Sequence, residues 1–142
     1  MNSRSSAANR PAPLAAPRSV LIGAWIAVVE CILGLGYGAF LMVRDFQGYE
    51  DPGAVISGWG TALWFYFIFG AVLTGAVFLL RGHRWGRGPI VMLNLCLAGV
   101  AFYMFTSGAI SLGLITVLFA LGALACMFNP KAVDWAANAY GA

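Results

Sequence analysis

The sequence predicts an all-α fold: a bundle of four transmembrane helices with both termini in the cytoplasm. Of its 142 residues, 61% are hydrophobic and only 9% are charged, whereas a soluble globular domain carries about 25% charged residues. The charged residues gather between long apolar runs. This composition excludes a soluble enzyme, a disordered chain and a nucleic-acid-binding domain, and it indicates an integral membrane protein of one domain.

Residues 1–19 predict a disordered cytoplasmic tail. They are rich in Ser, Ala, Pro and Arg, and Pro11, Pro13 and Pro17 prevent a continuous helix. A cleaved secretory signal peptide is the alternative. Its apolar region would exceed the usual length of about 7–15 residues and would contain Glu30, which favours the tail.

Four apolar runs are long enough to cross a bilayer, for which a helix needs about 20 residues. A spanning segment must satisfy its own backbone hydrogen bonds, and the runs lack the alternation of strands, so we expect helices. The predicted spans are 20–43, 61–80, 89–105 and 110–128. The short connection between the last two makes them antiparallel neighbours.

Residues 129–142 predict a cytoplasmic tail that lies at the membrane interface. Asn129 and Pro130 end the fourth apolar run. A short amphipathic helix is expected to follow. Its weak apolar face would consist of Val133, Ala136, Ala137 and Tyr140.

The distribution of basic residues predicts the orientation, because cytoplasmic segments carry an excess of Lys and Arg. Arg44 alone falls on the side of the acidic residues Asp45, Glu50 and Asp51. The other seven basic residues fall on the opposite side: Arg4, Arg10, Arg18, Arg81, Arg84, Arg87 and Lys131. We therefore expect a multi-pass protein of the plasma membrane with its termini inside, and Trp25, Trp85 and Trp135 near the inner interface.

Each predicted helix has one face of small residues, which is what close packing of helices in lipid requires. The first span contains Gly34-x-x-x-Gly38, and the fourth places Gly113 and Ala120 on one face. The small-residue faces of the other two spans contain Ala71, Thr74 and Gly75, and Asn94, Ala98 and Ala101. A compact four-helix bundle follows, and a homodimer through Gly34 and Gly38 is the alternative.

Glu30 is the one charged-type residue inside a predicted span. It lies about 15 Å along the helix from Val20, near the middle of the bilayer. An acid at that depth costs at least about 2.5 kcal/mol and usually faces the bundle interior, where a neutral carboxyl is favoured. Thr116 is the partner expected at the best matching depth, and Asn94 and Thr74 lie nearer the inner surface.

Two interpretations of Glu30 remain open. Glu30 is either a protonated hydrogen-bond donor that fixes the helix register, or a group that functions directly. In the second case it titrates during transport of protons or cations, or it meets a cationic group of a partner.

No other residues predict chemistry. The three cysteines lie in apolar runs without metal-site spacing, and His83 lies in a basic loop where it is expected to be solvated. No nucleophile–base pair, zinc motif or phosphate-binding loop is present in the sequence. We therefore expect no catalytic site, no cofactor and no metal.

Two resemblances add to this interpretation. A lone Glu in the first of four spans resembles the small multidrug resistance transporters, although that family has shorter chains and tight loops. The stretch 80–89, a basic loop with Trp85 that is followed by Pro89 and an apolar helix, resembles small four-span membrane proteins of actinobacteria. The excess of Arg over Lys is in keeping with a genome of high GC content. The resemblance implies membership of that family and no particular activity.

The sequence thus predicts a non-enzymatic accessory or structural membrane subunit. Its expected partners are the lipid bilayer and another membrane protein or a second copy of the chain, and not nucleic acid. The alternative is a small homo-oligomeric transporter or channel that uses Glu30 for proton or cation coupling.

Overall fold

The computed structural model describes residues 15–49 and 58–138. Their long helices are α1 (Arg18–Phe46), α2 (Gly58–Leu80), α3 (Arg87–Thr106) and α4 (Ile110–Met127), with the single turn η1 (Arg84–Gly86) before α3 and the short α5 (Pro130–Ala137) after α4. Four helices are long and apolar enough to cross a membrane. The predicted all-α class with four spans is therefore confirmed.

The helices extend beyond several of the predicted spans. Arg18 and Ser19 belong to α1, not to the predicted tail, and α1 also continues through Arg44 and Asp45. Charged residues stop an apolar run but not a helix, which is why hydropathy alone ends the spans too early. Pro89 lies inside the first turn of α3, a position where a missing N–H costs no hydrogen bond.

The chain segments outside the long helices are described only in part. Residues 1–14, the acidic residues Glu50 and Asp51, and Tyr140 lie outside the described residues. Asn129 caps α5 by accepting a hydrogen bond from the backbone N–H of Lys131 at 3.1 Å. α5 buries Ala132 and Trp135. Trp135 therefore packs against the bundle, and its place near the inner interface stays a prediction.

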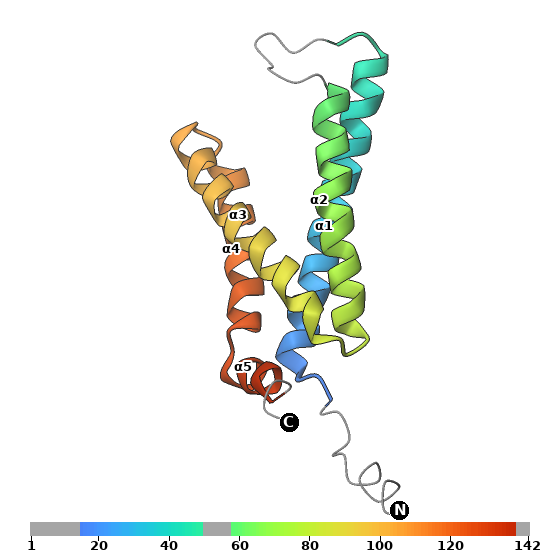
Figure 1. Cartoon of the computed structure of the whole chain (residues 1–142). Coiled ribbons are helices and arrows are strands. Elements are labelled where there is room, and N and C mark those ends of the chain that lie inside the picture. The colour runs from blue at the N-terminus through green and yellow to red at the C-terminus, as the bar shows by residue number, and fades with distance from the viewer. Residues whose placement is uncertain (1–14, 50–57, 139–142) are drawn as a thin grey trace, which may run out of the picture.

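The four long helices form two hairpins (Figure 1). α1 packs along α2, α3 packs along α4, and the hairpins meet through α1 with α4 and α2 with α3. In Figure 1 the hairpins lie close together near α5 and diverge toward the opposite end. We call the end with α5 and the start of α1 the terminal end, and the end with Ser107 and Gly108 the turn end.

The main hydrophobic core lies at the terminal end, which explains why the hairpins are joined there. It takes residues from the first half of α1, the second half of α2, the start of α3, the last turn of α4 and α5. Its most buried members include Val20, Ala24, Ala27, Leu79, Ile90 and Met127, each with 0% exposure. Toward the turn end each hairpin packs mostly within itself, so the predicted bundle closes at one end only.

Small residues bring the helices of each hairpin together. A Cβ atom at Gly34 would overlap the ring of Phe69 on α2, and one at Gly38 would lie 3.3 Å from Phe65. The Gly34-x-x-x-Gly38 pair is therefore covered by α2 of the same chain. In the second hairpin, a Cβ at Gly113 would lie 3.1 Å from the carbonyl oxygen of Ala101. Ala120 is fully buried.

The expected packing face of α2 is wrong in part. Gly75 is buried as predicted, but Ala71 and Thr74 are exposed. The buried face contains Val72, Ala76 and Leu79 instead. Small residues occur on more than one side of this helix, so their spacing does not select the face that packs.

Two backbones approach each other closely at the terminal end, between α2 and η1. A Cβ atom at Gly86 would overlap the carbonyl oxygen of Gly75. Because the nearest atoms belong to the backbone of Gly75, a side chain at position 86 can only be accommodated if α2 and η1 move apart.

We expect Gly86→Ala to lower the melting temperature of the detergent-solubilised protein by several degrees, since overpacking costs about 1–3 kcal/mol. Gly88→Ala is the matched control, because a Cβ at Gly88 meets no atom within 4 Å. Equal melting temperatures for the two variants, measured by scanning fluorimetry, would contradict the close approach.

Candidate functional site

Glu30 lies on the face of α1 that points into the bundle. Ala27, Cys31 and Gly34 share this face at helical spacing, and all are buried. The carboxyl side chain is 7% exposed. Because Ala27 and Cys31 belong to the core of the terminal end, Glu30 lies where that core ends and the hairpins begin to diverge.

The partner of Glu30 is Asn94 on α3. The side-chain Nδ2 of Asn94 donates to Glu30 Oε2 at 3.2 Å and to the carbonyl oxygen of Ile90, one turn earlier on α3, at 2.9 Å. Asn94 is fully buried. The bond thus joins the first hairpin to the second, and the second bond to α3 fixes the orientation of the amide.

Two buried oxygen atoms of this pair have no hydrogen-bond partner among the described residues: Oε1 of Glu30 and Oδ1 of Asn94. A buried polar atom without a partner costs about 1–3 kcal/mol. Such atoms are rare in native structures, and each one calls for a physical reason.

A cavity of about 190 Å³ adjoins Glu30 on the turn-end side. All four long helices contribute to its wall, through Glu30, Leu33, Gly34, Phe69, Leu97, Ile115, Thr116 and Phe119. Leu33 and Ile115 are 64% and 55% exposed, so the cavity opens to the surroundings of the bundle. A cavity of about 150 Å³ holds a benzene molecule, so this one has room for a side chain of similar size.

The wall of the cavity is apolar apart from Glu30 and Thr116. Thr116 on α4 was expected as the best partner of Glu30, but its Oγ1 donates to the carbonyl oxygen of Leu112 at 2.8 Å and lies 3.8 Å from the sulfur of Met104. The hydroxyl is therefore bonded within the second hairpin, and Thr116 joins the site as a cavity wall.

Thr74, the fourth expected member, lies elsewhere. It is exposed on α2 and donates to the carbonyl oxygen of Gly70 at 2.9 Å. The structure thus brings Glu30 and Asn94 together, places Thr116 on the same cavity, and separates Thr74 from it.

Sequence reasoning missed the apolar wall of the cavity. Leu33 and Leu97 follow Glu30 and Asn94 by one helical turn, and Ile115 precedes Thr116. One turn along the same face is the position that a cavity next to a polar pair requires. This spacing was the only sequence signal for the cavity wall. It does not single out these residues, because apolar residues occur at such positions in every span.

The site offers a carboxyl and an amide group for hydrogen bonding. Toward the terminal end it is closed by Ala27, Ile90, Met127 and their neighbours, which are fully buried. Among residues 15–49 and 58–138, no group of three or more His, Cys, Asp or Glu side chains is placed to hold a metal ion. A single carboxyl beside an amide can accept or donate a hydrogen bond and can pair with a cation.

No known protein family, curated protein or solved structure matches this chain. The two resemblances noted in the sequence therefore stay predictions. What the site does has to be argued from its geometry.

We expect Asn94→Ala and Glu30→Ala each to destabilise the protein, and the double variant to cost less than the sum of the two. Residues in direct contact usually show a coupling of about 0.5–3 kcal/mol. The loss of stability of each single variant and of the double variant is measured by unfolding the protein in mild detergent with urea or heat.

Thr74→Val is the matched control for this cycle, because Thr74 is exposed and its hydrogen bond stays within one helix. Its effect should stay within about 0.5 kcal/mol. Strict additivity of the two alanine substitutions would show that Asn94 and Glu30 do not interact.

Proposed function

We propose that this protein is a non-enzymatic accessory subunit of the plasma membrane that receives a transmembrane segment of another membrane protein between its two hairpins. The observation that carries this proposal is the buried carboxyl of Glu30, whose Oε1 has no partner among the described residues and adjoins an open apolar cavity.

The apolar exterior supports a position in the membrane. The four long helices expose bulky side chains along their length, among them Ile32, Phe40, Phe67, Phe102 and Leu118. In water such a surface would drive aggregation, whereas in lipid it meets hydrocarbon. With the basic terminal end inside, as the distribution of charge favours, Glu30 lies near the middle of the bilayer.

The chemistry of the occupant follows from what Glu30 lacks. No basic side chain of the chain lies at its depth, because the Arg and Lys residues fall at the ends of the spans. In its ionised form Glu30 would be completed by a hydrogen-bond donor or a cation from outside. A donor side chain on a partner helix supplies one, and the cavity is large enough for one such side chain but not for a whole helix.

The backbone of that helix would lie outside the cavity, against its exposed wall. At the terminal end the hairpins are held together by the core, and toward the turn end they separate (Figure 1). A partner helix that packs against the exposed Leu33 and Ile115 would place one side chain against Glu30. Helix association in lipid depends on such close packing together with polar bonds.

The alternative is a homo-oligomeric transporter or channel that uses Glu30 for proton or cation coupling. A buried acid near mid-membrane favours it. The fully buried core between Glu30 and the terminal end opposes it for a single chain in this conformation. A pathway would need a second conformation or a second copy.

We expect a photoreactive residue in place of Ile115 to cross-link a stoichiometric foreign membrane protein in native membranes. Leu114, on the same helix at nearly the same depth, is the matched control, because it is 51% exposed but does not line the cavity. The products are identified by mass after gentle extraction.

Substitutions of Glu30 then test its role in that complex. Glu30→Leu should reduce the amount of co-purified partner at least tenfold, because a lost charge-assisted bond amounts to about 1.5–3 kcal/mol. Glu30→Gln removes the charge but keeps an oxygen acceptor. A partner with a neutral donor side chain should still bind this variant, whereas a partner with a cationic side chain should not. Cross-links only between copies of the chain, with a proton flux in liposomes that Glu30→Gln abolishes, would favour the alternative.

A further inference from the structure

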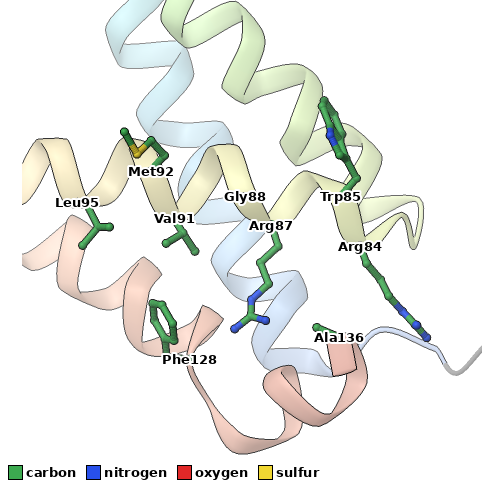
Figure 2. Close-up of a pocket in the computed structure, with 9 residues that line it drawn as sticks. All are labelled: Arg84, Trp85, Arg87, Gly88, Val91, Met92, Leu95, Phe128 and Ala136. Carbon is green, nitrogen blue, oxygen red and sulfur yellow. The ribbon is translucent and has the colours of Figure 1, made fainter. Parts of the chain in front are cut away.

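A second cavity, independent of Glu30, lies at the terminal end between α3, the end of α4 and α5 (Figure 2). Its volume is about 520 Å³, within the range of about 300–1,000 Å³ that is typical of small-molecule sites. Two cationic side chains and a row of apolar ones share its wall: Arg84, Arg87, Val91, Met92, Leu95 and Phe128.

Arg87 is held in place by the second hairpin. Its guanidinium group donates to the carbonyl oxygen of Met127, in the last turn of α4, and lies 5.5 Å from the centre of the Phe128 ring. The Nε of Arg87 is buried and has no hydrogen-bond partner among the described residues. The group is therefore oriented, with part of its donor capacity unused.

Arg84 is held in a similar way by α5. Its guanidinium carbon lies 5.1 Å from the centre of the Trp135 ring. Figure 2 shows the Arg87 side chain running from the start of α3 toward α5, whereas the Arg84 side chain runs from η1 in another direction, so that the two guanidinium groups lie apart. Within the described part of the chain, neither arginine is paired with a carboxylate, so two positive charges face one cavity without an internal counter-ion.

The remaining wall changes from polar to apolar along α3. Val91, Met92 and Leu95 follow Arg87 on this helix, and Leu95 lies about 12 Å from it along the axis. Met92 and Leu95 are 64% and 55% exposed. A ligand that fits has an anionic group at one end and a hydrocarbon chain of at least that length.

We propose that this cavity binds one anionic phospholipid, with its anionic headgroup at the end of the wall that carries Arg84 and Arg87 and an acyl chain along Val91, Met92 and Leu95. A guanidinium group matches a phosphate in geometry and forms charge-assisted, often bidentate bonds with it. Trp85, which is 65% exposed beside the arginines, belongs to the headgroup level where Trp is enriched. Basic pockets at this level are suited to anionic headgroups.

Orientation of the arginines by rings and a carbonyl group distinguishes this cavity from a general attraction to lipid. A mobile surface arginine loses conformational freedom when it binds a phosphate, whereas a side chain already held in place loses less. Arg81 provides the comparison within the chain. It is exposed on the connection before η1 and does not line the cavity.

Native mass spectrometry of the full chain tests the proposal. The protein is released from vesicles that contain equal amounts of phosphatidylglycerol and phosphatidylcholine. We expect one phosphatidylglycerol molecule to remain bound to the wild type, in preference to phosphatidylcholine. Arg84→Gln and Arg87→Gln should each reduce its retention about tenfold, as the loss of one charge-assisted bond predicts.

Arg81→Gln is the control and should retain the lipid as the wild type does. Arg84→Gln keeps the bond between Arg87 and Met127, so it remains informative if Arg87→Gln fails to fold. Soluble glycerol phosphate in millimolar excess should not displace the lipid, since it lacks the chain that contacts α3. Equal losses for all three substitutions, or displacement by glycerol phosphate, would overturn the proposal.

Discussion

The hydrogen bond between Asn94 and Glu30 joins the two hairpins at the point where they separate. In hydrocarbon no water is available to replace such a bond, so both side chains must face inward and meet. This requirement fixes the rotation of α1 and α3 about their axes. The apolar core of the terminal end then follows from the residues one and two turns before the pair.

The two cavities differ because they lie at different depths. The one beside Glu30 has a wall of apolar side chains and offers a single acid. The proposed lipid site beside Arg84 and Arg87 lies at the end of the bundle, where charged side chains are tolerated. One site is therefore suited to a specific polar group of a partner, and the other to the membrane itself.

Hydropathy predicts the spans well because the membrane imposes one length and one polarity on every helix. It predicts the pairing of polar groups less well. Counting residues from the inner surface gave Thr116 the best depth match to Glu30, yet Asn94 forms the bond. Counting residues from the inner surface assumes that all helices have the same tilt. The tilt of each helix is set by its packing against the others, so the sequence of a single helix does not predict it. The same limit explains why Ala71 and Thr74 of α2 lie outside the packed face.

The choice of an amide as the partner of Glu30 has a consequence for its charge. Nδ2 of Asn94 can donate to the ionised carboxylate and also to the carbonyl oxygen of the protonated carboxyl, so the amide keeps its bond to Ile90 in both states. A basic partner would hold Glu30 in the charged form only. The pair therefore keeps the hairpins joined in either protonation state, which leaves Oε1 available to an occupant of the cavity without loss of the contact on which the fold depends.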